Sequence, residues 1–158
     1  MVMFMTYIGI DPGRYGAYAA IHDDGSAETH IWNDRNFIEW IKKIQPPVVT
    51  CLEGVHAFPD DNKNGVRGVT STFNFGKSAG FIEGVLNSFN IPYERVDPRR
   101  WKKEFALDSD KQKSIAECKK LFPDVSLLAT SRSRVDSDGM AEALLMAEYA
   151  RRYLAPQD

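Results

Sequence analysis

The most constraining feature of this chain is a strand–turn–strand segment that carries a single acidic residue. Residues 7–10, Tyr-Ile-Gly-Ile, form an apolar run that stops at Asp11. Residues 12–16 contain Pro-Gly and a further glycine, which allow a tight hairpin before a second apolar run over 17–21. We therefore expect Asp11 to be held at the end of a central strand.

Two further segments place acidic residues in similarly defined positions. Residues 48–52 are typical of a short buried strand, which ends in Glu53, and a C-terminal helix opens at Asp138. Positions i and i+4 share a helix face, so Asp138 and Glu142 are expected to point together. Asp136 lies about 200° away from Asp138 around such a helix, which favours a role as N-cap. Strand acids combined with helix-start acids suit a two-metal phosphodiester site.

Each acid also has an ordinary structural explanation. An acid before Pro-Gly is commonly a turn residue, and an acid at a helix start is commonly a cap or a partner of the helix dipole. Glu53 is harder to explain in this way, because a carboxylate that ends a Val-Val-Thr-Cys-Leu run is partly buried and needs a partner or a metal ion. The combination of acids is more specific than any one of them.

Composition limits the class of protein. The 158 residues suit one domain spanning 1–158, and the 43% hydrophobic and 27% charged residues are ordinary globular values. Cys51 and Cys118 show neither a disulfide framework nor zinc spacing, which suits a reducing cytosol. The chain start lacks the features of a signal peptide, and no apolar run could span a membrane. We expect a cytoplasmic protein without a membrane partner.

The charge distribution is uneven. A net charge of −2 argues weakly against bulk nucleic-acid binding, but the segment 94–120 holds nine Lys or Arg residues against six acids. Metal ions would also neutralise part of the acidic charge of a metal site in use. This distribution favours a nucleic-acid contact in the segment, and the alternative for any single lysine is a solvated helix face.

Hydrophobic periodicity and turn residues predict a mixed α/β order. The expected strands cover 6–11, 16–22, 27–32, 48–53 and 93–96. The expected helices begin at Asn33 or Asp34, run over 71–89, begin at Ser109 or Asp110, and run over 138–153. This order resembles the ribonuclease H-like fold, a mixed five-stranded sheet flanked by helices with the first strand central and the fourth beside it.

The ordered motifs resemble RuvC-type Holliday junction resolvases, in particular their phage and plant-organellar branch. The resemblance rests on residues 8–13, 51–55, 96–103, 110–114, 121–123 and 138–147. The first motif alone is shared with sugar kinases and Hsp70-like ATPases, whereas the ordered set is specific. The resemblance implies a homodimer that binds a four-way DNA junction and nicks two opposing strands. It also implies two Mg²⁺ or Mn²⁺ ions per active site, and no nucleotide cofactor is expected.

The resemblance also assigns roles to residues. The implied catalytic metal ligands are Asp11, Glu53, Asp138 and Glu142, and the implied phosphate contacts are Lys102 and Lys111. Lys103 and Lys113 are expected to contact DNA as well. Where bacterial members carry a junction-contacting phenylalanine, this chain has His56 and then Phe58, so Phe58 is the expected base contact. Glu142 stands where those members commonly carry an aspartate. This difference leaves open whether Asp136 or Asp138 is the dominant metal ligand near the start of the helix.

Other functions would account for parts of this sequence. An actin-like ATPase or sugar kinase would need a second lobe that this length cannot supply. A related ribonuclease H-like nuclease acting on RNA or other branched DNA, and an inactive junction-binding protein, are the remaining alternatives. A symmetric dimer would supply two nicks, and its expected interface is the helix with Gly76, Ala79, Gly80, Phe81, Gly84 and Leu86. The alternative for these glycines is packing on the sheet.

Overall fold

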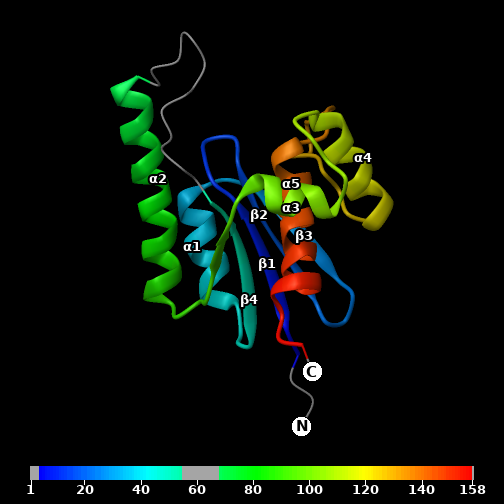
Figure 1. Cartoon of the computed structure of the whole chain (residues 1–158), viewed down its shortest axis with the longest axis horizontal. Coiled ribbons are helices and arrows are strands. Elements are labelled where there is room, and N and C mark those ends of the chain that lie inside the picture. The colour runs from blue at the N-terminus through cyan, green and yellow to red at the C-terminus, as the bar shows by residue number, and fades with distance from the viewer. Residues whose placement is uncertain (1–3, 55–67, 158) are drawn as a thin grey trace.

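The chain forms a five-stranded mixed sheet with helices on both faces (Figure 1). The computed structural model describes residues 4–54 and 68–157. The strands are β1 (Thr6–Asp11), β2 (Ala17–His22), β3 (Ala27–Ile31), β4 (Val48–Glu53) and β5 (Glu94–Val96). Their order across the sheet is β3-β2-β1-β4-β5. The predicted fold class is therefore confirmed, with the first strand central and the fourth beside it.

The helices follow the predicted order with one addition. They are α1 (Asp34–Lys43), α2 (Val69–Ser88), α3 (Pro98–Glu104), α4 (Lys111–Leu121) and α5 (Asp138–Tyr149), followed by a π-helical turn, η1 (Ala150–Leu154). The sequence order did not include α3, which begins at a proline and is capped by the Asp97 carboxylate, an acceptor for the backbone N–H of Arg99. Within the described ranges, no helix is long and apolar enough to cross a membrane.

The register of β1 brings two acids to the same edge of the sheet. β1 pairs with β2 in antiparallel fashion and with β4 in parallel fashion, and Ile10 lies opposite Leu52. Asp11 and Glu53 are the next residues along, so they end neighbouring strands side by side. Successive side chains of a strand point to opposite faces. Because Ile10 and Leu52 pack in the core beneath α1 and α2, Asp11 and Glu53 face the opposite side.

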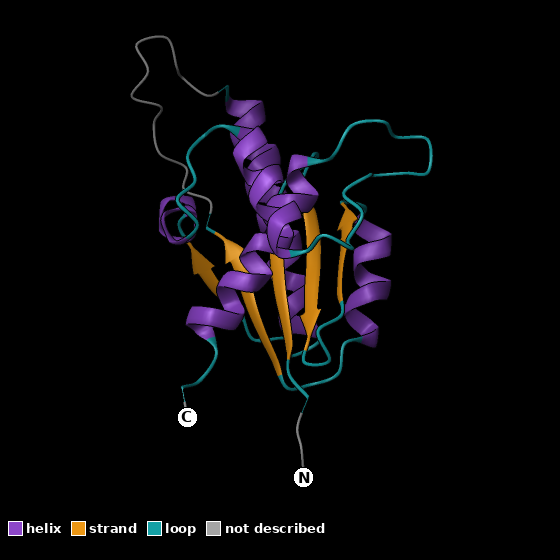
Figure 2. Cartoon of the chain, turned by 90° about the vertical axis from the view of Figure 1, so that its right-hand side faces the viewer, coloured by secondary structure: helices purple, strands orange, loops and turns teal. Residues whose placement is uncertain are grey.

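That opposite side is covered by α5, which is buried along its length from Gly139 to Tyr149. Figure 1 shows the strands between the α1–α2 layer and the layer formed by α3, α4 and α5, and Figure 2 shows the sheet from the side of the second layer. Gly9 permits the close approach of α5, because a Cβ atom there would lie 2.0 Å from the carbonyl oxygen of Ala143. The start of α5 is thereby held over the end of β1.

The glycines of α2 lie on its outer face and do not pack on the sheet. Apart from its chain neighbours and the backbone of its own helix, a Cβ atom added to any of these three glycines would meet no atom of residues 4–54 and 68–157 within 4 Å. These glycines are Gly76, Gly80 and Gly84. The residues that pack on the sheet are instead Ile82, Val85 and Leu86, with Phe81 partly buried beside them. The alternative prediction, in which these glycines pack on the sheet, is therefore wrong. Leu86 is buried and is not available to an interface.

Candidate functional site

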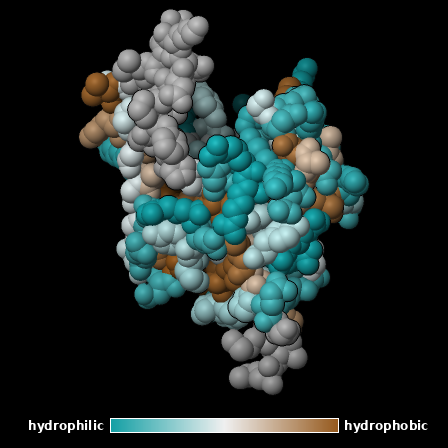
Figure 3. All heavy atoms as spheres, in the orientation of Figure 1, coloured by the Kyte–Doolittle hydropathy of each residue, from teal (hydrophilic) through white to brown (hydrophobic). Residues whose placement is uncertain are grey.

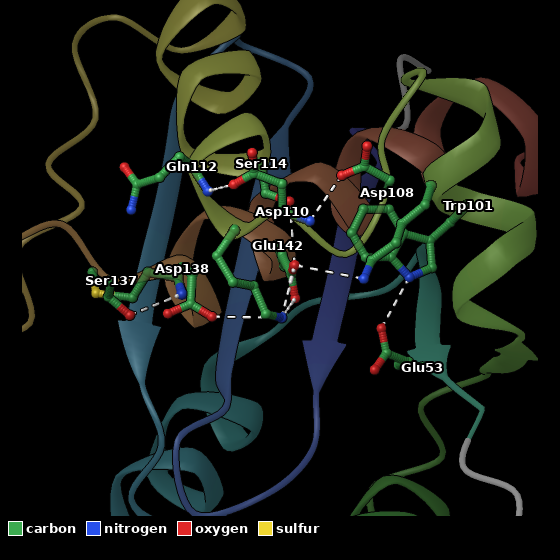
Figure 4. A network of polar contacts seen from close by, with 12 residues as sticks. Glu53, Trp101, Asp108, Asp110, Gln112, Ser114, Ser137, Asp138 and Glu142 are labelled. Carbon is green, nitrogen blue, oxygen red and sulfur yellow. Dashed lines mark hydrogen bonds and ion pairs between the residues drawn. The ribbon is translucent and has the colours of Figure 1, made fainter. Parts of the chain in front are cut away.

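Carboxylates from three elements meet at the end of the central strands. Asp11 ends β1. Glu53 ends β4, and Asp138 and Glu142 lie in the first turns of α5 (Figure 4). Burial, and then the negative charges of Glu53, Glu142 and Asp138, raise the pKa of Asp11 well above its usual range. The structure thus brings together the acids that the sequence singled out.

Two glycines fix the turn that carries Asp11. A Cβ atom at Gly16 would lie 1.9 Å from the carbonyl oxygen of Asp11, so a side chain has no room in this turn. A Cβ atom at Gly139 would lie 2.5 Å from the carbonyl oxygen of Tyr15, so the first turn of α5 packs directly on the same turn. The strand acid and the helix acids are therefore held in one rigid arrangement.

The cap of α5 differs from the prediction. The side chain of Ser137 accepts the backbone N–H of Met140 at 3.2 Å, which makes Ser137 the N-cap. Asp136 lies outside the helix, in an isolated β-bridge with Leu128, and its carboxylate pairs with Lys119. The prediction that Asp136 is the N-cap is therefore wrong. The helix begins at Asp138, and the N-cap is the residue directly before it, Ser137.

Glu142 is the most enclosed of these acids and is surrounded by donors. Its side chain is 3% exposed. The Lys111 Nζ atom lies 3.1 and 3.2 Å from its two carboxylate oxygens, and the Ser114 hydroxyl donates to Oε1 at 3.2 Å (Figure 4). The Lys102 Nζ atom lies 3.8 Å from Oε1. Glu142 is thus a compensated charge in the absence of any metal ion.

Lys111 contacts two acids at once. Its Nζ atom also lies 3.6 Å from the Asp138 carboxylate. Burial lowers the pKa of Lys111, but the charges of Glu142, Asp138 and Asp11 and the hydrogen bond to Glu142 outweigh burial, so the pKa is raised. The ammonium group is therefore charged at neutral pH.

Glu53 has a different partner, which the sequence reasoning did not identify. The fully buried indole of Trp101 donates to the Glu53 Oε2 atom at 3.0 Å. Burial raises the pKa of Glu53, the bond from Trp101 lowers it, and the charge of Glu142 raises it again, with a raised pKa as the result. A buried indole N–H needs an acceptor, and this is the sequence signal that could have pointed to the contact.

The other predicted DNA-binding lysines are not found at the acid cluster. Lys103 is exposed, and Lys113 is exposed and pairs with Asp108 rather than with the acid cluster. Phe58 lies outside the described residues. Of the lysines, Lys102 and Lys111 are therefore the two that the structure brings to the carboxylates.

The donor set suits a hard divalent cation. It consists of carboxylate oxygens, which Mg²⁺ and Mn²⁺ prefer. Asp11 and Glu53 are enclosed, have raised pKa values and form no ion pair within 4 Å among the described residues, so neither carboxyl group has a cation directly beside it there. In that part of the chain, no three acidic, imidazole or thiol side chains are already arranged around one metal position. The chemistry of the residues fits a metal ion, and Lys111 stands among the acids in its absence.

Comparisons with known proteins bear on the fold. No protein-family model matches the chain, and no curated protein matches its sequence. A Thermus thermophilus RuvC structure in complex with a Holliday junction substrate matches with a TM-score of 0.56 and 14% identity, covering 96% of this chain and 97% of that one. A second Thermus thermophilus RuvC structure matches with a TM-score of 0.53 and 15% identity, covering 94% and 96%. The resemblance found in the motifs thus extends to the whole architecture, and this chain has the fold of RuvC.

Proposed function

We propose that this protein is a metal-dependent endonuclease that resolves four-way DNA junctions by nicking two opposing strands. The observation that carries the proposal is the convergence of Asp11, Glu53, Asp138 and Glu142 at one end of a RuvC-like sheet. The similar Thermus thermophilus protein was solved with a Holliday junction substrate. The proposal includes one nuclease domain over 1–158, a place in the cytoplasm, and the phage or plant-organellar branch of the family.

The four acids would hold two Mg²⁺ or Mn²⁺ ions, which would supply a hydroxide nucleophile and stabilise the leaving 3′ oxygen, leaving a 5′ phosphate. Within this scheme Trp101 is a positioning residue, because its indole N–H fixes the orientation of the Glu53 carboxylate. The first turn of α4 orients Glu142 through Lys111 and Ser114. The protein thus sets the geometry of the acids before substrate arrives.

DNA would approach the same end of the sheet. The ammonium groups of Lys102 and Lys111 lie at the acid cluster, where they can contact the phosphates beside the cleaved bond. Lys103 and Lys113 lie one and two residues after Lys102 and Lys111, and both are exposed. They would extend the contact along the DNA backbone. Phe58 would stack on an unpaired base at the junction centre.

The active unit is proposed to be a symmetric dimer that uses the outer face of α2. That face carries the open glycines together with exposed Val69 and Phe73, which are 85% and 68% exposed. Figure 3 shows hydrophobic atoms at the upper left of the molecule, where Figure 1 places the start of α2. Gly80→Arg tests this interface, because a Cβ atom there would meet no described atom within 4 Å apart from its chain neighbours and the backbone of its own helix. Light scattering should report a monomer for this variant and a dimer for the wild type.

The activity test compares substrates and metals. A mobile four-way junction, a duplex, a flap and an RNA–DNA hybrid are incubated with the protein in Mg²⁺, in Mn²⁺ and in EDTA. We expect paired nicks in opposing strands of the junction, only with metal, and none with Glu53→Gln as the matched control. Equal or faster cleavage of the hybrid or the flap would instead favour a related nuclease that acts on RNA or other branched DNA. Binding without cleavage in either metal would favour an inactive junction-binding protein.

A further inference from the structure

We infer that the ammonium group of Lys111 occupies the position of a metal ion between Glu142 and Asp138, so that Lys111 and the second divalent cation exclude each other. This inference rests on the proposed metal-dependent nuclease. It assigns to Lys111 a role in the metal-free protein that differs from a phosphate contact. Lys111 would hold the helix acids in place until the site is loaded.

Lys111 contacts both of the helix acids that would hold a divalent cation. Its Nζ atom lies 3.1 and 3.2 Å from the two carboxylate oxygens of Glu142 and 3.6 Å from Asp138 (Figure 4). The Glu142 side chain is 3% exposed, so few other directions of approach to its oxygens exist. A divalent ion that bridges Glu142 and Asp138 would need the oxygen lone pairs that Lys111 now uses.

The position of Lys111 allows it to leave. It is the first residue of α4, directly after the N-cap Asp110, so its backbone is fixed. Its side chain is nevertheless 51% exposed, and a lysine stem has four flexible carbons. The ammonium group can therefore swing towards solvent or DNA without any movement of α4. Ser114, one turn further on, keeps its bond to Glu142 during such a change.

The charge of the cluster also supports the exclusion of a second divalent ion by Lys111. With all four acids ionised, the carboxylates and the ammonium groups of Lys102 and Lys111 together carry a formal charge of −2, which one divalent ion balances. That ion would be drawn to Asp11 and Glu53, which have no ion pair among the described residues. A second ion meets the Lys111 charge at close range, and such repulsion is strong in a partly buried site. When Lys111 leaves, this repulsion is lost. The carboxylates of Glu142 and Asp138 are then free to bind the metal ion.

A consequence is coupling between metal binding and DNA binding. The displaced ammonium group is free to contact a phosphate, so metal loading should tighten junction binding through Lys111. Linkage requires the converse effect, in which junction DNA tightens metal binding by the same factor. Lys111→Met removes both competition and coupling.

Mn²⁺ binding to the full chain tests the inference without reference to activity. Titration calorimetry and paramagnetic resonance are performed on wild type, Lys111→Met, Lys111→Arg and Lys113→Met. We expect Lys111→Met to bind the second Mn²⁺ ion at least about tenfold more tightly than wild type, a change of roughly 1.4 kcal/mol. Lys111→Arg keeps the charge and should resemble wild type. Lys113→Met is the matched control, because Lys113 pairs with Asp108 outside the cluster.

The second measurement is junction affinity with and without Ca²⁺, under conditions that prevent cleavage. Ca²⁺ should tighten binding by wild type more than binding by Lys111→Met, and Lys111→Gln is used should the methionine variant fail to fold. Unchanged or weaker Mn²⁺ binding by the neutral variants, with wild type that binds Mn²⁺ and cleaves junctions, would overturn this inference alone. Wild type that neither binds Mn²⁺ nor cleaves would overturn the proposed function as well.

Discussion

Replacing Asp11 by asparagine is expected to stabilise the metal-free protein while abolishing cleavage. Burial and the charges of Glu53 and Glu142 raise the pKa of Asp11 well above its usual range. The folded protein therefore retains a proton that the unfolded chain has already released. Stability consequently falls as the pH rises from the unfolded pKa, about 3.9, through the raised folded pKa. Asparagine cannot ionise, so the variant escapes this loss.

The size of the gain follows from the burial of the carboxylate. Each unit by which a folded pKa exceeds the unfolded pKa costs about 1.4 kcal/mol once the group is forced to ionise. Removing one unpaired charge from water costs several kcal/mol even after the protein relaxes around it. Because asparagine has nearly the same shape as aspartate, no cavity offsets the gain. We expect Asp11→Asn to increase the free energy of unfolding by about 1–4 kcal/mol at neutral pH.

Urea denaturation in EDTA measures this difference, at neutral pH and near pH 4, about where free carboxyl groups titrate. The gain should shrink at the lower pH, where Asp11 is protonated in the folded state and about half protonated in the unfolded state. Asp124→Asn is the matched control, because Asp124 is exposed and lies outside the cluster. Adding Mg²⁺ should stabilise wild type more than Asp11→Asn. A variant that is less stable than wild type at neutral pH, or a gain that is equal at both pH values, would refute the reasoning.

Four further substitutions separate the roles of the site residues. Glu53→Gln should abolish cleavage and leave junction binding intact or tighter, and equal loss of both in the folded variant would show that Glu53 also serves binding. Asp138→Asn should reduce the nicking rate at saturating Mg²⁺ far more than Asp136→Asn, because Asp138 contacts Lys111 whereas Asp136 pairs with Lys119; the reverse ranking would make Asp136 the ligand. Trp101→Phe removes a hydrogen bond worth about 1.5–3 kcal/mol to a charged acceptor. Since that bond lowers the pKa of Glu53, the acid limb of the pH–rate profile should move to higher pH, and an unmoved limb would argue against positioning by Trp101.

The sheet could be predicted from the sequence because its signals are local. Apolar alternation around Ile8 and Ile10 identifies the strand, and the Pro-Gly turn after Asp11 identifies the hairpin. The pairing of β1 with β4 then follows from the topology, which places Asp11 beside Glu53. The helix period similarly placed Asp138 and Glu142 on one face, where Lys111 now contacts both.

The contacts around the acids could not be predicted in this way. Trp101 and Glu53 are 48 residues apart, and Lys111 and Glu142 are 31 apart, so these bonds depend on how α3 and α4 pack against the sheet and α5. The glycines of α2 indicated close packing, but the pattern does not say whether the partner lies in the same chain. The cap of α5 was displaced by one residue, because Ser137 and Asp136 are both good caps and only the backbone decides.

The two halves of the site differ in how their charges are compensated, and this difference has a measurable sign. Asp11 repels its neighbours without an ion pair among the described residues, whereas Asp138 faces Lys111 at 3.6 Å and its side chain is 48% exposed. Asp138→Asn therefore removes an attraction to Lys111 together with a repulsion of Asp11, and an ion pair of this exposure contributes about 0–1 kcal/mol. In the same urea experiment without metal, Asp138→Asn should leave stability unchanged or slightly lower it, opposite in sign to Asp11→Asn. If both variants gained stability equally, the whole cluster would be repulsive, and Lys111 would not be compensating the helix acids.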